Sequence, residues 1–243
     1  MIILFTDFGT TDPYIGQIKA VLAQQAPNEQ VIDLLHHVPD FEITAGAYLL
    51  PAYVNEFPEE SIFVCVVDPG VGGEREAIVA RIDKQWFVGP DNGLLDVLAM
   101  RAKDVEWWHI NYDDSQVSAS FHGRDIFAPI AALIASGDLS ALRPCAETRA
   151  IASMPDDITR IVFIDHFGNL ISGYRYDSLQ NGNEIHFKGK RICRARTFSD
   201  VSPGEAFFYK NSNGLLEIAV NQGSAAEKFN AVAGDRFSFI GEK

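Results

Sequence analysis

Two acidic residues of the sequence lie just after apolar runs that are short enough to be buried strands. Asp7 comes after Ile2–Phe5, and Asp68 comes after Ser61–Val67. In an open α/β sheet, ligands collect beyond the carboxyl ends of the strands. A carboxylate at that edge can accept hydrogen bonds from a ligand or take up a proton from it. Asp7 and Asp68 are therefore candidate site residues.

Asp68 opens a glycine-rich loop with the sequence DPGVGGER, which ends at Arg75. Pro69 stiffens this loop, and its three glycines let the backbone approach a ligand closely or adopt positive φ angles. The alternative is an ordinary loop, in which Asp68 caps nearby N–H groups and Arg75 pairs with Glu74 or Glu76. Taken alone, the segment favours the ordinary loop.

A third polar cluster, with the sequence FHGRD, precedes a predicted helix that begins near Asp125 and runs to Ser136. His122 would lie close to the N-terminus of this helix, where the positive end of the helix dipole favours a neutral imidazole and attracts anions. The alternative is that Asp125 caps the helix and pairs with Arg124, which would leave His122 on the surface.

The other histidines are weaker candidates for chemistry. His36 and His37 follow a predicted strand and could be ligands, but adjacent side chains point in different directions. His109 lies in an apolar run and is predicted to be a core residue, His166 lies beside a turn, and His186 alternates in a strand. The sequence has no Walker loop, no GxSxG motif and no HExxH motif.

The elements that must position these residues alternate strands with helices in the first half of the chain. The predicted strands are Ile2–Phe5, Val31–Leu35, Ser61–Val67, Ile78–Ile82 and Trp86–Gly89. The first predicted helix has Asp12 as its N-cap and Pro13 as its first residue. Three more helices are predicted, over Ile43–Val54, directly after Asn92-Gly93, and over Asp125–Ser136. This alternation predicts an α/β domain with a largely parallel sheet over residues 1–145.

The second half of the chain has closely spaced short strands without helical periodicity. Residues 141–157 carry few bulky apolar side chains and are predicted to be a linker. The predicted strands are Arg160–Asp165, Leu170–Tyr176, Glu184–Lys188, Ile192–Phe198, Ala206–Tyr209, Leu215–Val220 and Asp235–Ile240. This pattern predicts a small all-β domain, a barrel or a sandwich, over residues 158–243.

Composition limits the classes of partner and the compartment. The chain has 243 residues, of which 47% are hydrophobic and 22% charged, as in a folded soluble protein. Its formal net charge of −13 disfavours nucleic acid and anionic membranes as partners. Three scattered cysteines without CxxC spacing argue against a disulfide framework or a zinc site. We therefore expect a cytoplasmic protein, without a signal peptide or a membrane-spanning segment.

Several segments occur in a fixed order: TDFG, VVDPGVGGER, GPDNGLL, FHGRDIFAP, FGN and NSNG. Together they resemble the S-adenosylmethionine (SAM) hydroxide adenosyltransferase family, the SAM hydrolases, which are related to fluorinases and chlorinases. The resemblance runs from Phe5 to about Ala226, nearly the whole chain. It implies hydrolysis of SAM to adenosine and methionine by an activated water that attacks the 5′ carbon.

The resemblance implies that Asp68, Arg75 and His122 activate this water. Arg75 is permanently charged and would stabilise developing hydroxide, while Asp68 or His122 would orient the water and take its proton. A sulfonium leaves as a neutral thioether and needs neither an acid nor a metal. We therefore expect no metal and no cofactor, with SAM itself as the substrate.

The resemblance also implies a set of substrate-binding residues. Asp7 matches the carboxylate that binds the ribose hydroxyls, and Asn169 and Ser212 match positions that hold adenosine and the amino-acid end. The full set is Asp7, Phe8, Asn169, Ser212, Phe167, Val220 and Asn221. For Phe167, Val220 and Asn221, the alternative is a role in turn or core packing.

Two features favour hydrolysis over halogenation. The stretch from Arg75 to Asp91 is short, whereas fluorinases carry a long insertion in this region, and the implied Asp–Arg–His set is the one that uses water. The resemblance further implies a homotrimer with its sites between subunits.

Two other classes of function remain open from the residues. The first is a metal-dependent phosphoester hydrolase with Asp7, Asp68, His37 and His122 as ligands, although a charge of −13 suits phosphate substrates poorly. The second is a non-catalytic sensor of SAM or adenosine, which would leave Arg75 and His122 without a task.

Overall fold

The computed structural model describes residues 1–145, 154–179 and 182–240. The chain divides into two compact units, Met1–Met154 and Pro155–Lys243. No helix in the described parts of the chain is both long and apolar enough to span a membrane.

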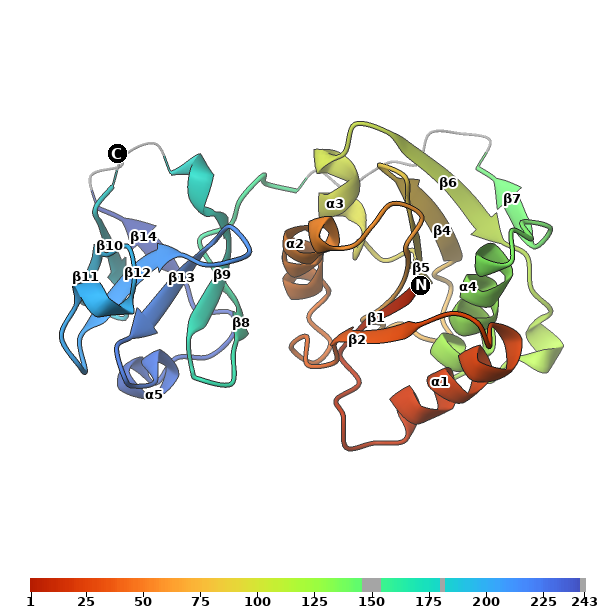
Figure 1. Ribbon diagram of the computed structural model, residues 1–243, viewed down its shortest axis with the longest axis horizontal. Helices are drawn as coiled ribbons and strands as arrows, with labels where there is room; N and C mark the ends of the chain where they lie inside the picture. The colour runs from red at the N-terminus through yellow and green to blue at the C-terminus, as the bar shows by residue number, and fades with distance from the viewer. Residues whose placement is uncertain (146–153, 180–181, 241–243) are drawn as a thin grey trace. The chain divides into compact units, whose positions relative to one another are not determined.

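The first unit is a seven-stranded sheet with helices on both faces. Its strands are β1 (Ile2–Thr6), β2 (Val31–Leu35), β3 (Ile62–Val66), β4 (Ala77–Ile82), β5 (Gln85–Pro90), β6 (Val105–Ile110) and β7 (Leu142–Pro144). Its helices are α1 (Tyr14–Gln25), α2 (Ile43–Tyr53), α3 (Asp96–Arg101), the π-helical turn η3 (Gly123–Phe127) and α4 (Ala128–Ala135). Helices α1 and α4 cover one face of the sheet, and α2 and α3 lie on the other side (Figure 1).

The sheet of the first unit is mixed, in the order β2-β1-β3-β5-β4-β6-β7. The pairs β2–β1, β1–β3 and β3–β5 are parallel, and the pairs β5–β4, β4–β6 and β6–β7 are antiparallel. The prediction of a largely parallel sheet is therefore correct for only half of the pairs. The reason is the two-residue turn between β4 and β5, where Asp83 and Lys84 have φ angles of 44° and 73°. Such a turn makes a hairpin, and a hairpin makes its strands antiparallel.

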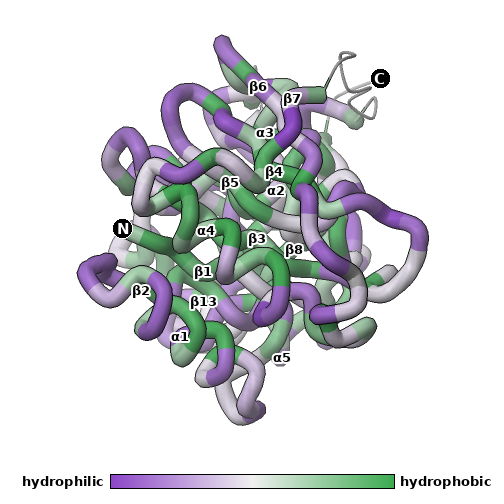
Figure 2. Tube along the Cα trace, turned by 90° about the vertical axis from the view of Figure 1, so that its right-hand side faces the viewer, coloured by the Kyte–Doolittle hydropathy of each residue, from purple (hydrophilic) through white to green (hydrophobic). Residues whose placement is uncertain are grey.

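Strand β3 lies inside the sheet and is buried along its whole length, as its continuous apolar run predicts. Ile62, Val64 and Val66 belong to the core that also contains Ile18 and Leu22 of α1. In Figure 2, strands β1 and β3 have the colour of hydrophobic residues, and the loops that connect the strands are more hydrophilic. The loop that follows β3 therefore starts from a rigid position.

Three local predictions in the first unit need correction. Helix α1 begins at Tyr14 with Pro13 as its N-cap, and no side chain caps it, so Asp12 does not have the predicted role. The helix predicted over Asp125–Ser136 is a π-helical turn followed by the shorter α4. The predicted linker contains β7 at its start, because backbone pairing with β6 does not require bulky side chains. Residues 146–153 of that linker lie outside the described residues.

The second unit is one seven-stranded sheet with a short helix. Its elements are β8 (Ile161–Ile164), β9 (Leu170–Arg175), β10 (Glu184–Phe187), β11 (Lys190–Arg194), β12 (Ala206–Lys210), β13 (Leu215–Val220), α5 (Ala225–Phe229) and β14 (Phe237–Phe239). The strand order is β14-β10-β11-β12-β13-β9-β8.

This sheet curls until its two ends are linked by backbone hydrogen bonds. The N–H of Ile161 donates to the carbonyl of Asp235 over 2.8 Å, and the N–H of Gly234 donates to the carbonyl of Ile161 over 2.8 Å. The N–H of Phe237 also donates to the carbonyl of Thr159 over 3.1 Å. The second unit is therefore a curled, barrel-like sheet and not a sandwich, with α5 as an addition to the predicted all-β domain.

Candidate active site

Asp68 and Arg75 form a buried ion pair beyond the carboxyl end of β3. The Nε atom of Arg75 lies 3.1 Å from each carboxylate oxygen of Asp68, and its Nη2 atom also contacts Oδ2. The two side chains are only 4% (Asp68) and 10% (Arg75) exposed. This forked pairing is a strong form of ion pair. The ordinary-loop alternative, with Arg75 paired to Glu74 or Glu76, is wrong.

Glycine is required in this loop at one position. Gly72 has a φ angle of +75°, and a Cβ atom there would clash with the carbonyl oxygen of Ala119. The loop after β3 therefore touches the segment that leads to His122, and the contact is possible because residue 72 has no side chain.

His122 joins the ion pair through Arg75. The Nη2 atom of Arg75 lies 2.8 Å from Nδ1 of His122. A guanidinium only donates hydrogen bonds, so Nδ1 is the acceptor and a neutral His122 carries its proton on Nε2. The imidazole is buried, with 7% exposure, so the alternative that left His122 on the surface is wrong. The structure thus brings together all three residues of the implied water-activating set.

One donor of Arg75 remains available. Its Nη1 atom is buried and forms no hydrogen bond with any residue that the structure describes. A buried polar atom without a partner is costly, and an incoming oxygen atom would satisfy it.

Two cavities meet at His122. The aromatic pocket, of about 140 Å³, is lined by residues that include Phe8, Tyr14, Asp68, Val71, Phe121 and His122. The ring centroids of Phe8, Tyr14 and Phe121 lie 5.3–6.0 Å apart. The polar chamber, of about 530 Å³, is lined by residues that include Glu74, Arg75, Glu76, His109, His122 and Arg143.

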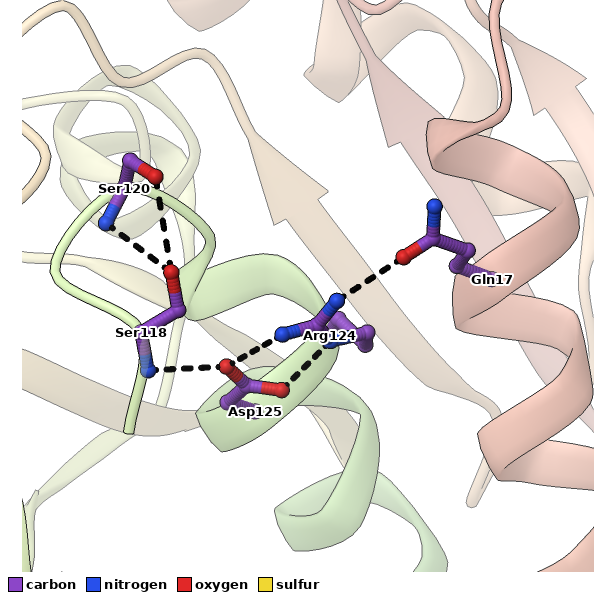
Figure 3. Close-up of polar contacts among 5 residues, drawn as sticks. All are labelled: Gln17, Ser118, Ser120, Arg124 and Asp125. Carbon is purple, nitrogen blue, oxygen red and sulfur yellow. Dashed lines mark hydrogen bonds and ion pairs between the residues drawn. The ribbon is translucent and has the colours of Figure 1, made fainter. Parts of the chain in front are cut away.

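A second network of hydrogen bonds holds the segment around His122 (Figure 3). Arg124 donates from Nε and Nη2 to the carboxylate of Asp125, over 2.6 and 2.9 Å, and from Nη1 to Gln17 of α1 over 2.8 Å. Asp125 accepts from the backbone N–H of Ser118 over 2.9 Å. The Arg124 guanidinium beside Asp125 lowers the pKa of that carboxyl. The predicted pairing of Arg124 with Asp125 is confirmed, and it ties both sides of His122 to α1.

Asp7 follows β1 and accepts a hydrogen bond from the backbone N–H of Phe41 over 3.0 Å. Burial raises the pKa of the Asp7 carboxyl, and the charges of Asp40 and Asp68 raise it further. Phe41 is 72% exposed and has a φ angle of 64°. The sequence gives no signal for Phe41, because phenylalanine is not a residue that favours positive φ.

The second unit has its own cavity, of about 830 Å³, and four predicted binding residues line it: Phe167, Asn169, Ser212 and Val220. Phe167 is 72% exposed, so it is not a core residue. Asn221 is not among the lining residues, and its side-chain amide donates to the carbonyl of Val201 over 2.8 Å. The contact with Val201 supports the packing alternative for Asn221.

Asp165 and Glu217 line the same cavity and were not predicted. Asp165 accepts from the backbone and side-chain amide of Asn169, over 2.8 and 2.9 Å. Glu217 accepts from the Tyr209 hydroxyl over 2.7 Å and from the Asn211 side chain over 3.0 Å. Burial raises the pKa of Glu217.

Asn211 links Glu217 to the turn that carries Ser212. Its side-chain oxygen accepts hydrogen bonds from the backbone N–H groups of Asn213 and Leu215, over 3.0 and 2.9 Å. Asp165 and Glu217 therefore position Asn169 and the Ser212 turn. The signal for Asp165 was its place two residues before the FGN turn, whereas Glu217 is hidden in an apolar strand.

Three other histidines, His36, His37 and His109, have local polar partners. His36 contacts the Thr6 hydroxyl over 2.9 Å, and His37 contacts the Thr10 hydroxyl over 3.3 Å. The prediction that His109 is a core residue is wrong, because it is one-third exposed at the end of β6 and pairs with Glu76. Within the described ranges, no group of three or more His, Cys, Asp or Glu side chains is placed to hold a metal ion.

Comparisons with known proteins match the chain along nearly its whole length. The SAM hydroxide adenosyltransferase N-terminal domain matches residues 2–143, and the C-terminal domain matches residues 159–238. A Salinispora tropica protein named (R)-S-adenosyl-L-methionine hydrolase is 36% identical, covering 95% of this chain and 94% of its own. A fluorinase of Actinopolyspora mzabensis is 23% identical, over 96% and 95%. The crystal structure of an uncharacterized conserved protein from Thermotoga maritima matches with a TM-score of 0.86 and 32% identity, over 98% of both chains.

Proposed function

Because the chain belongs to the SAM hydroxide adenosyltransferase family, we propose that it is an enzyme that hydrolyses S-adenosyl-L-methionine to adenosine and L-methionine. The identity to the hydrolase is 36%, against 23% to the fluorinase over a similar share of the chain. The observation that carries the proposal is the convergence of Asp68, Arg75 and His122 at the aromatic pocket and the polar chamber.

This set offers an attacking water a hydrogen-bond donor and a proton acceptor. Arg75 donates from Nη1 and so stabilises negative charge on the water oxygen. The water in turn donates to the carboxylate of Asp68. His122 cannot accept this proton at Nδ1, because Arg75 occupies that lone pair. Asp68 is therefore the proton acceptor, and His122 holds the Arg75 guanidinium in place through Nδ1.

The reaction balances without a metal or a cofactor. The water oxygen forms a bond to the 5′ carbon while the bond from that carbon to sulfur breaks, and the electron pair of the broken bond stays on sulfur. The sulfonium thereby becomes the neutral thioether of methionine. One proton of the water passes to Asp68 and from there to solvent, so adenosine keeps a 5′ hydroxyl. Charge decreases at both ends of the reacting system, which favours the reaction in a dry site.

Each unit carries its own substrate-binding residues in this proposal. Asp7 accepts hydrogen bonds from the two ribose hydroxyls, a role that a single carboxylate can fill. Phe8 contributes to the wall of the aromatic pocket. In the second unit, Asn169 and Ser212 supply polar groups, with Phe167 and Val220 as apolar contacts.

We further propose a homotrimer in the cytoplasm with sites shared between subunits. The family resemblance supports this arrangement, and light scattering of the purified protein tests the oligomeric state.

An assay of the purified protein tests the proposed activity. Protein treated with a chelator is incubated with each sulfonium epimer of SAM, with and without chloride or fluoride, and products are separated by chromatography. We expect adenosine and methionine in equal amounts, with preference for the R epimer named in the relative. A halogenated nucleoside would identify a halogenase instead, and tight binding of SAM without products would identify a sensor.

A further inference from the structure

The aromatic pocket and the polar chamber lie on either side of His122. Of the residues that line these two cavities, His122 is the only one in common. The aromatic pocket is small and contains three packed rings. The polar chamber is larger, and charged side chains form much of its wall. The two cavities therefore suit different reactants.

We propose that the polar chamber is the inlet through which water reaches Arg75 and His122, separate from the site of the organic substrate. This inference rests on the proposed hydrolysis of SAM. Displacement at a saturated carbon requires the nucleophile to approach opposite the leaving group. A reacting carbon held in the aromatic pocket would block that side, so the water needs a second route.

Arg75 supports this assignment. It lines the polar chamber and is not among the residues that line the aromatic pocket. Its buried Nη1 atom is the donor that has no hydrogen-bond partner among the described residues. A water that enters through the chamber therefore meets an unused donor of the residue that stabilises hydroxide.

The charges of the chamber favour a neutral occupant. Asp68 neutralises Arg75, and Glu74, Glu76 and Arg143 place charges of both signs in the wall, so no strong field of one sign selects a cation or an anion. Water is the neutral reactant that hydrolysis consumes. It can exchange hydrogen bonds with all of these side chains.

The chamber is built on paired strands and does not depend on a moving segment. His109 of β6 is paired with Ile78 of β4 on one side and with Arg143 of β7 on the other. The contact between Gly72 and Ala119 fixes the two loops that complete the wall. An inlet of this kind stays open while the substrate is bound.

Aromatic substitutions in the chamber wall test the inlet. Asn111 and Arg143 line the chamber and have exposed side chains, and the backbone bond from Asn111 to Ala141 does not depend on its side chain. We expect the double variant Asn111→Phe/Arg143→Phe to lower kcat for SAM hydrolysis about tenfold or more, with unchanged affinity for adenosine. The affinity is measured by calorimetry, and thermal unfolding confirms that the variant folds.

Two controls separate obstruction from other effects. The double variant Asn111→Ala/Arg143→Ala removes the same polar groups without adding bulk, so its kcat should exceed that of Asn111→Phe/Arg143→Phe. Glu106→Phe adds an aromatic ring to an exposed position of β6 outside the chamber lining and should leave kcat unchanged.

The possible results have different meanings. A kcat of the double variant equal to that of the wild type overturns the inlet and leaves the hydrolase assignment intact. A parallel loss of adenosine affinity also overturns it, because the chamber would then hold the organic substrate. Absence of turnover in the wild type overturns the proposed function and the inlet together.

Discussion

Arg75 donates a hydrogen bond from Nη2 to Nδ1 of His122 over 2.8 Å, while its Nε and Nη2 atoms pair with Asp68. Arg75 therefore lies at the centre of the set and defines the roles of both neighbours. It holds the Asp68 carboxylate by a forked contact, and it fixes the tautomer of His122. A lysine cannot make these contacts at the same time, because its ammonium is a single point of charge.

Arg75→Lys should therefore lose most of the activity although it keeps the positive charge. We expect kcat to fall by about two orders of magnitude or more, since oriented donors to a developing anion contribute at least that much. Adenosine affinity should stay within about threefold of the wild type, because Arg75 does not line the aromatic pocket. The measurement is steady-state hydrolysis together with calorimetry of adenosine binding. Wild-type kcat in this variant would show that geometry at Arg75 is unimportant.

Gly72→Ala should destabilise the first unit and lower kcat. A methyl group at this position is strained by the positive φ angle and also clashes with the Ala119 carbonyl. Gly137→Ala is the matched control, because its φ angle is +80° but nothing lies within 4 Å of the added carbon. The control should lose about 1–2 kcal/mol from backbone strain alone, and Gly72→Ala should lose more. Urea unfolding measures both, and equal losses would contradict the close contact.

Arg124→Ala should lower kcat without a comparable change in KM. The change removes the pair with Asp125 and the bond to Gln17, so the segment around His122 loses its link to α1. We expect a decrease of about tenfold, and a smaller decrease for Gln17→Leu, which removes only one hydrogen bond of about 1 kcal/mol. Steady-state kinetics of the two variants checks the order. A larger effect of Gln17→Leu would show that the pair with Asp125 does not position His122.

Glu217→Gln should change the dependence of stability on pH. Burial raises the pKa of Glu217 above its ordinary value of 4.5, so ionisation of this carboxyl opposes folding. This cost is absent below pH 4.5 and grows as the pH rises through the folded-state pKa. The free energy of unfolding of the variant, relative to wild type, should therefore increase from acidic to neutral pH. The exposed Glu227 on α5 provides the control Glu227→Gln, which removes a carboxyl and leaves the hydrogen bonds of Glu217 in place.

The sequence was sufficient for the family and for the three residues that meet in the first unit. Position after a strand and before a helical segment made Asp68 and His122 candidates, the family resemblance joined them to Arg75, and the structure places both groups beside it. Their catalytic roles stay predictions until the variants are assayed. Asn169, Ser212 and Phe167 were predicted from the family resemblance of the FGN and NSNG segments, and they line one cavity.

Other features left little or no trace in the sequence. The turn at Asp83 and Lys84 has neither glycine nor asparagine, so the antiparallel half of the first sheet was missed. Glu217 lies in the run LLEIAV, where a strand pattern predicts packing and not a buried hydrogen-bond network. The tautomer of His122 depends on a contact over 47 positions of sequence and requires coordinates.

The backbone bonds that join Thr159 and Ile161 to the region of Gly234–Phe237 also affect how the protein behaves when it is concentrated. An open sheet presents a row of unsatisfied amide and carbonyl groups that can recruit a strand from another molecule. In the second unit, the two ends of the sheet satisfy part of this row internally. The curl therefore protects the domain against edge-to-edge aggregation, in addition to shaping its cavity.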